Sequence, residues 1–250
     1  MLEDLEVCLF SNYVFRFNVL TEQTEFCKKG EKVFHLVDQR ALNTFCMEAR
    51  KQGVNCWDKD VSRLLLSQQI ADFHPFSDYA DSLPEWDGVD RVSELARRVS
   101  DEALWVSGFH RWMLGMVAQW MKLEGQCANA VAPLLVSTEQ GRCKSTFCSI
   151  ILPEELQRFY IDKFDLTSVS GCEQKLSQFG LINMDEFDRY SVRSMANLKN
   201  LMQLKKLTFR KSHRSYYSQL PRIASFIGTI NQKELLTDTT GSRRFLCVEV

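Results

Sequence analysis

The sequence predicts an α/β protein in which a parallel sheet flanked by helices fills the carboxyl-terminal half. Three observations predict this class. Apolar runs within residues 131–146, 179–188 and 222–231 have the length and composition of buried strands. The first run leads into a polar loop and an apparent helix that begins with Lys144. The second run ends in two acidic residues, at the strand end where α/β folds bind ligands.

The amino-terminal region is predicted to be a small α+β unit. Residues 13–17 and 32–37 have the pattern of short strands, and we expect them to form a hairpin. Helical spacing of apolar residues follows at 38–53 and again at 58–71. A strand pair with two helices is compatible with a winged-helix-like module, which would serve either to bind nucleic acid or as a packing or linker element.

A helical region is predicted between this unit and the sheet. Pro75 and Pro84 mark the passage into it. Large apolar residues between 105 and 121 then recur at spacings of three and four, which is typical of an apolar helix face. We interpret this face as core that packs against the sheet.

The loop after the first apolar run has the composition of a nucleotide-binding loop, with Lys144 for the β- and γ-phosphates and Ser145 for Mg²⁺. Thr138 and Cys143 stand where the usual motif has glycine. The alternative is an ordinary strand-to-helix turn with a surface lysine. The predicted binding residues are Glu139, Gln140, Gly141, Arg142, Cys143, Lys144, Ser145 and Thr146.

The acidic strand end supplies the complementary half of such a site. Asp185 is expected to hold Mg²⁺ and Glu186 to orient an attacking water. The combination of a lysine–serine loop with a strand that ends in two acids is more specific than either feature. The alternative for Asp185, Glu186 and Asp188 is a solvated turn before the next helix.

Two further features fit the same site. Asn231 ends the third apolar run and is expected to contact the γ-phosphate or the water, or else to cap a turn. Arg243 and Arg244 precede a last apolar strand at 245–250. Either one is a candidate for an arginine that reaches the nucleotide of a neighbouring subunit, and the alternative is a solvated basic pair.

These segments resemble the virulence-associated protein E family, whose ATPase core is similar to superfamily 3 helicases and primase-helicases of mobile elements. The resemblance is carried by residues 82–91, 139–147, 181–188 and 238–245. It implies a P-loop ATPase of the AAA+ type that takes ATP and Mg²⁺ and assembles as a homo-oligomeric ring on DNA. The sequence departs from the family pattern at Cys143 and Ile230. The family usually continues into a further helical region, so the core is expected to be truncated at its carboxyl end.

A basic and aromatic segment at 205–217 is the strongest nucleic-acid feature of the sequence. By the same resemblance, a hairpin here lines the pore of the ring and grips single-stranded DNA. The alternatives are a solvated basic hairpin or a subunit interface. The expected DNA contacts are Arg210, Lys211, His213 and Arg214.

The amino-acid composition limits the classes of protein and of binding site that are possible. The 250 residues are 45% hydrophobic and 25% charged, with a formal net charge of −1, so nucleic-acid binding requires a local basic patch. No apolar run is long enough to span a membrane, and the acidic start does not have the pattern of a signal peptide. The nine cysteines include no Cys-x-x-Cys pair, which favours reduced thiols and a cytoplasmic location and argues against a zinc site.

The expected organisation is an accessory region at 1–75, a helical region at 76–128 and a P-loop ATPase core at 129–250. The expected function is Mg²⁺-dependent ATP hydrolysis by a helicase or replication initiator of a mobile element, acting on single-stranded or forked DNA with a primase or another replication protein. Two alternatives are a slow nucleotide-binding switch and a non-enzymatic DNA-binding or scaffold protein with a degenerate loop.

Overall fold

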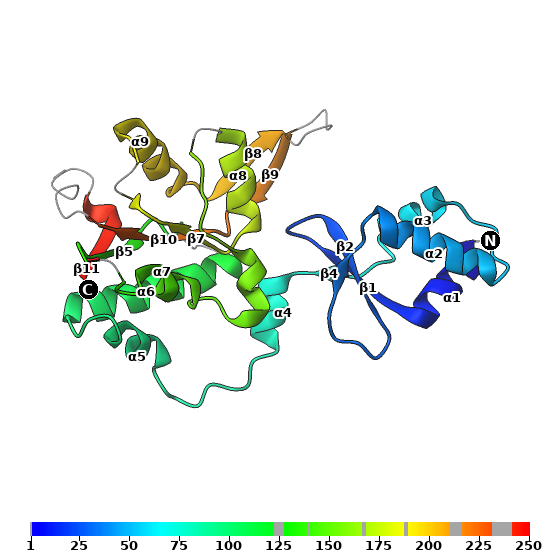
Figure 1. Cartoon of the computed structure of the whole chain (residues 1–250), viewed down its shortest axis with the longest axis horizontal. Helices are drawn as coiled ribbons and strands as arrows, with labels where there is room; N and C mark the ends of the chain where they lie inside the picture. The colour runs from blue at the N-terminus through cyan, green and yellow to red at the C-terminus, as the bar shows by residue number, and fades with distance from the viewer. Residues whose placement is uncertain are drawn as a thin grey trace. The chain divides into compact units, whose positions relative to one another are not determined.

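The chain divides into two compact units, Met1–Asp78 and Tyr79–Val250 (Figure 1). The computed structural model describes residues 2–122, 128–139, 141–166, 169–187, 190–210, 217–231 and 242–250. Among the described residues, none of the helices combines the length and the apolar character that crossing a bilayer requires.

The first unit is an α+β structure with a sheet of strand order β3-β2-β1-β4. Its core is formed by apolar side chains of the three long helices and the first two strands, with Phe45 of α2 in ring contact with Tyr13, Phe15 and Phe26. The elements are α1 (Leu2–Asn12), β1 (Tyr13–Asn18), β2 (Gln23–Lys28), β3 (His35–Leu36), α2 (Gln39–Lys51), α3 (Asp58–Leu65), β4 (Asp72–Phe73) and α4 (Pro75–Asp81), which continues past the unit boundary. The predicted helix at 38–53 is confirmed by α2, whereas that at 58–71 ends at Leu65.

The predicted hairpin of residues 13–17 with 32–37 is wrong. The antiparallel partner of β1 is β2, and the later segment contributes only the two-residue β3, which pairs with β2. The sequence of β2 is mostly polar, so its burial could not be predicted from hydrophobic pattern. Glu25 is 1% exposed because its carboxylate accepts hydrogen bonds from Arg16 Nε at 2.8 Å and Asn18 Nδ2 at 3.0 Å.

The second unit contains a five-stranded sheet of order β11-β5-β10-β7-β6, in which all neighbouring strands are parallel. The strands predicted within residues 131–146 and 245–250 are confirmed by β5 and β11. The strand predicted to finish in Asp185–Glu186 ends at Met184, and the one predicted at 222–231 begins only at Ser225. The elements are α5 (Arg91–Arg97), α6 (Ala103–Trp120), β5 (Ala132–Val136), α7 (Lys144–Ser149), the 3-10 helix η1 (Glu154–Phe159), β6 (Tyr160–Ile161), α8 (Val169–Gln178), β7 (Leu181–Met184), α9 (Val192–Leu201), β8 (Lys206–Arg210), β9 (Tyr217–Pro221), β10 (Ser225–Ile230), the 3-10 helix η4 (Ser242–Arg244) and β11 (Phe245–Glu249).

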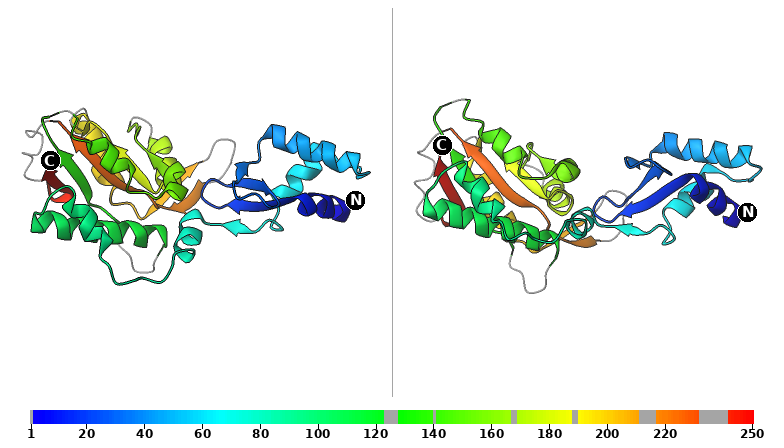
Figure 2. Two further views of the ribbon diagram at one scale, coloured as in Figure 1. Left: turned by 60° about the horizontal axis from the view of Figure 1, so that its bottom comes forward. Right: turned by 90° about the horizontal axis from the view of Figure 1, so that it is seen from below.

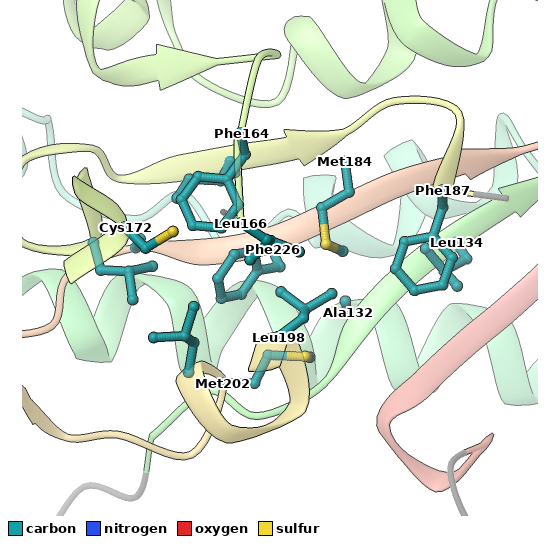
Figure 3. Close-up of a cluster of buried hydrophobic side chains, with 14 of the residues drawn as sticks. Ala132, Leu134, Phe164, Leu166, Cys172, Met184, Phe187, Leu198, Met202 and Phe226 are labelled. Carbon is teal, nitrogen blue, oxygen red and sulfur yellow. The ribbon is translucent and has the colours of Figure 1, made fainter. Parts of the chain in front are cut away.

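Helices cover both faces of this sheet. Figures 1 and 2 show α6 and α7 on one face and α8 and α9 on the other. Figure 3 shows the buried cluster on the second face, where Leu134, Met184 and Phe226 of three strands meet Cys172 of α8 and Leu198 of α9. On the first face, the apolar stripe predicted in α6 is buried through Trp105, Phe109, Trp112, Met116 and Trp120.

The strand begins late because the backbone N–H groups of Arg222, Ile223 and Ala224 donate to Lys205 and Leu176, which lie outside the sheet. Arg222 is also the centre of a buried polar cluster. Its side chain is 2% exposed and donates to the carbonyl oxygens of Asn129 at 2.7 Å and Leu201 at 2.9 Å. Gln119 completes this polar cluster by donating from Nε2 to the carbonyl oxygen of Ala224 at 2.7 Å. Burial lowers the pKa of Arg222 to about 9, so the guanidinium still carries its charge at pH 7. Arg222 and Ala224 thus connect the start of β10 to Gln119 of α6.

Gly228 sets the spacing of the central strands. A Cβ atom at this position would lie 2.8 Å from the carbonyl oxygen of Met184 in β7 and 2.9 Å from a methyl group of Leu134 in β5. Only glycine therefore allows β10 to lie this close to both neighbours.

We expect Gly228→Ala to lower the free energy of unfolding by about 2–4 kcal/mol, because the nearest contact is backbone that cannot move without separating β10 from β7. Urea denaturation measures this change. Gly108→Ala in α6 is the matched control, since its Cβ would meet only the flexible end of Leu246, at 2.8 Å, and alanine favours the helix. An equal loss of stability in both variants would contradict this role of Gly228.

Candidate functional site

The carboxyl ends of three neighbouring strands meet at one edge of the five-stranded sheet. β10 lies between β5 and β7, with Ile230 paired to Val136 and Gly228 paired to Met184. Each strand continues into a polar segment, and together these segments line a cavity of about 340 Å³. Its lining residues are Glu139, Gly141, Arg142, Cys143, Lys144, Ser145, Thr146, Asp185, Glu186, Thr229 and Asn231. The volume falls within the range of small-molecule sites.

Lys144 joins the ends of β5 and β10. Its ammonium group donates to the carbonyl oxygen of Ser137 at 2.8 Å, to that of Ile230 at 3.3 Å and to Oδ1 of Asn231 at 2.9 Å. All three partners are uncharged, so the positive charge of Lys144 is placed at the sheet edge without being neutralised by them. The structure thus brings Lys144 and Asn231, both of which the sequence analysis assigned to the candidate site, into direct contact.

Asp185 receives two hydroxyl groups on the same oxygen. Ser145 Oγ donates to Asp185 Oδ1 at 2.9 Å, and Thr229 Oγ1 donates to the same atom at 2.6 Å. Ser145 and Asp185 are forty residues apart in the sequence, and their contact connects the loop after β5 to the end of β7. The carboxylate is therefore held in one orientation from two directions.

Thr229 is the site residue that the sequence did not reveal. Its side chain is 2% exposed, and its hydroxyl also accepts a hydrogen bond from the backbone N–H of Glu186 at 3.2 Å. One hydroxyl thus positions both acidic residues. The available signal was a polar residue near the end of the apolar run, two positions before Asn231.

Two of the residues that line the cavity are non-glycine residues with a left-handed backbone. Cys143 has φ 52° and Glu186 has φ 51°. This conformation costs roughly 1–2 kcal/mol for a residue with a side chain, and such strain is concentrated at functional sites. Cys143 stands where the usual loop has glycine, and the structure gives it the backbone conformation that glycine adopts most easily.

Glu139, Gly141, Arg142 and Thr146 of the loop also line this cavity. Arg142 Nε donates to Glu139 Oε2 at 2.8 Å, and the two charges form an exposed ion pair. Cys143 is exposed, whereas Cys148 of α7 is buried. Burial, and next the nearby Asp185 carboxylate, raise the pKa of the Cys148 thiol to about 12, so this thiol stays protonated.

Arg243 and Arg244 do not line this cavity. Arg244 is half-buried, and its Nε lies 3.3 Å from the side-chain oxygen of Gln203 when that amide is oriented to accept the hydrogen bond. Arg243 is exposed. The backbone of Arg210 lies in β8. Gln140, Asp188, Lys211, His213 and Arg214 lie outside the described residues.

The fold and the site define a mixed α/β protein whose five-stranded parallel sheet gathers a lysine, two hydroxyl groups and two acids at its carboxyl edge. The model of the virulence-associated protein E-like domain matches residues 80–250. The chain therefore belongs to this family, as its sequence motifs predicted. No match was found among curated proteins.

Solved structures of the NrS-1 C-terminal region have a similar fold. An apo structure of residues 305–718 is 10% identical, with a TM-score of 0.57, and the match covers 99% of this chain and 61% of that one. An A-form apo structure of the same region is 14% identical, with a TM-score of 0.55 and coverage of 99% and 60%. The chain thus spans about 60% of the length of that structure, and at such identities the likeness concerns the fold alone.

We expect Cys143→Gly to leave the free energy of unfolding unchanged or to raise it by up to about 1 kcal/mol, because relief of the left-handed backbone offsets the added flexibility of the unfolded chain. Arg142→Gly, at a neighbouring position without positive φ, is the control and should lower it by about 0.5–1 kcal/mol. Chemical denaturation of both variants measures the difference. A larger loss of unfolding free energy in Cys143→Gly than in Arg142→Gly would contradict the conclusion that the backbone of Cys143 is strained.

Proposed function

We propose that this chain is a P-loop ATPase of a mobile-element replication protein, which hydrolyses ATP with Mg²⁺ and works as a ring-forming DNA helicase or replication initiator. The single observation that carries the proposal is the contact of Ser145 Oγ with Asp185 Oδ1 at 2.9 Å, beside Lys144. A loop hydroxyl and a strand-end carboxylate are the pair that holds Mg²⁺ in P-loop nucleotide hydrolases. Family membership supports the same assignment.

The donor set of the cavity fits ATP with Mg²⁺. A cation held by Ser145 and Asp185 would take its other ligands from phosphate oxygens and water, as Mg²⁺ prefers. When bound, Mg²⁺ neutralises charge on the phosphates and fixes their orientation. The ammonium group of Lys144, which its uncharged partners do not neutralise, is suited to the β- and γ-phosphates.

Glu186, the second acidic residue, is assigned to orient the attacking water. Glu186 follows Asp185 and lines the same cavity, so its carboxylate can orient a water toward the γ-phosphate. Asn231 lies on the neighbouring strand end and contacts Lys144 at 2.9 Å, which suits it to respond to the presence of that phosphate. The backbone N–H groups and Arg142 of the loop at 139–146 complete the phosphate-binding side.

Assembly would bring an arginine to this site from a neighbouring subunit. Arg243 is exposed, whereas Arg244 contacts Gln203 of its own chain, so Arg243 is the better placed of the two to reach outward. Single-stranded or forked DNA would contact the hairpin of β8 and β9, in which Lys206 is exposed and Tyr217 is 70% exposed. A primase or another replication protein is the partner that such a role implies.

A slow nucleotide switch is the second candidate. The observation that favours it is the non-glycine Cys143 in a left-handed conformation immediately before Lys144, which makes this loop stiffer than a glycine-rich one. Turnover rate separates the two functions, because both bind ATP and only the motor hydrolyses it rapidly in the presence of DNA.

We expect the purified chain to hydrolyse ATP with Mg²⁺, and single-stranded DNA to stimulate the reaction. Lys144→Ala and Glu186→Gln should each lower kcat at least about 100-fold, because they remove phosphate binding and water orientation. Phosphate release in a steady-state assay measures this. Lys163→Ala, at an exposed position that does not line the cavity, is the control. Wild-type turnover in Lys144→Ala would refute the assignment.

Thr229 provides a second test through its hydroxyl. We expect Thr229→Val to raise the Mg²⁺ concentration needed for half-maximal turnover, because Asp185 loses the donor at 2.6 Å and Glu186 loses its backbone acceptor. Thr229→Ser keeps the hydroxyl and should keep the wild-type Mg²⁺ dependence. A Mg²⁺ titration of both variants separates a positioning role from a packing role. If Thr229 served only in packing, Thr229→Val would keep the wild-type Mg²⁺ dependence, because valine has nearly the same shape.

A further inference from the structure

The first unit carries two cavities that share lining residues. One, of about 510 Å³, lies among the end of α1, the end of β2 and the end of α2. The other, of about 320 Å³, lies among β2, β3 and α2. Both are lined by Tyr13, Lys28 and Glu48, so they adjoin at these residues. We call the surface formed by both cavities the α2 groove.

Positive charge is concentrated in the α2 groove. Residues 1–78 carry nine lysines and arginines against twelve aspartates and glutamates, so the unit as a whole is acidic. Four of these cations nevertheless line the groove, namely Lys28, Lys29, Lys51 and Arg40, and all four are exposed. Within the described residues, none of the four forms an ion pair.

The two acids of the groove are already engaged. Glu48 accepts a hydrogen bond from the Tyr13 hydroxyl at 2.8 Å. Asp38 is the N-cap of α2 and accepts from the backbone N–H of Ala41 at 2.7 Å. The groove therefore presents cationic side chains without ion-pair partners among the described residues, and carboxylates that already accept hydrogen bonds. This combination suits an anionic ligand.

The floor of the smaller cavity is aromatic. Phe26 packs against Phe45 with ring centroids 4.9 Å apart, and the exposed ring of His35 lies 6.1 Å from that of Phe26. Single-stranded nucleic acid carries both phosphates, which lysine side chains can bind, and flat bases, which can stack on an aromatic ring. An acidic peptide would interact with the lysines but would not need the aromatic surface.

We propose that the α2 groove binds single-stranded nucleic acid, with phosphates on Lys28, Lys29 and Lys51 and a base against the Phe26–His35 floor. This site is separate in sequence from the β8–β9 hairpin. It does not depend on the proposed ATPase activity, because none of its residues belongs to the second unit.

The test is fluorescence anisotropy of the full chain, without ATP, using labelled oligothymidylate and oligouridylate at several salt concentrations. Lys28→Glu/Lys51→Glu should weaken binding at least about tenfold and reduce the slope of log K against log salt by about 2. Lys28→Gln/Lys51→Gln should show a smaller change in the same direction. Comparing the two oligonucleotides shows whether the site prefers DNA or RNA.

Lys59→Glu/Arg63→Glu is the matched control, because it makes the same charge change on exposed positions of α3 that do not line the groove. Photo-crosslinking with 5-iodouracil-containing oligonucleotides should label peptides within residues 23–52. Equal affinity and equal salt slope in the groove and control variants would overturn the proposal. Crosslinks confined to Lys206–Pro221 would also overturn it, since they would place all binding on the hairpin.

Discussion

The position of β10 between β5 and β7 is the constraint on which the site depends. Parallel pairing brings the three carboxyl ends to one edge, so that Lys144, Asp185 and Asn231 meet although they are far apart in the sequence. Thr229 then connects the central strand to both acids through one hydroxyl. A shift of β10 by one residue would turn Thr229 to the other face of the sheet and break this connection.

The opposite end of β10 is fixed by polar contacts in the interior. Arg222, Gln119 and Asn129 join the start of the strand to α6 and to the end of α9, largely through backbone carbonyl oxygens. A buried charge with uncharged partners is costly, and such a group tolerates few alternative arrangements. We infer that this cluster fixes the register of the central strand, while the apolar cluster of Figure 3 supplies most of the burial.

The sequence was sufficient for the sheet, because continuous apolar strands are a local pattern. Of the predicted site residues, Lys144, Asp185 and Asn231 line one cavity at the strand ends. The sequence was not sufficient for β2, because the burial of Glu25 depends on hydrogen bonds from Arg16, which lies opposite it in β1, and from Asn18, two residues further along β1. It also missed Thr229, whose role depends on contacts with residues more than forty positions away. The roles of Arg243, Arg244 and the hairpin tip stay predictions, since they concern other subunits, DNA or residues outside the described part.

The most direct test of the central claim is whether Mg²⁺ and ATP stabilise the fold through Lys144. Thermal unfolding of the wild type with increasing ATP and Mg²⁺ should show a rising Tm, equivalent to about 2.7 kcal/mol at 100 times Kd. Lys144→Ala should show no such rise. A Tm that ATP leaves unchanged in the wild type, or raises equally in both proteins, would contradict a nucleotide site at the ends of β5, β10 and β7.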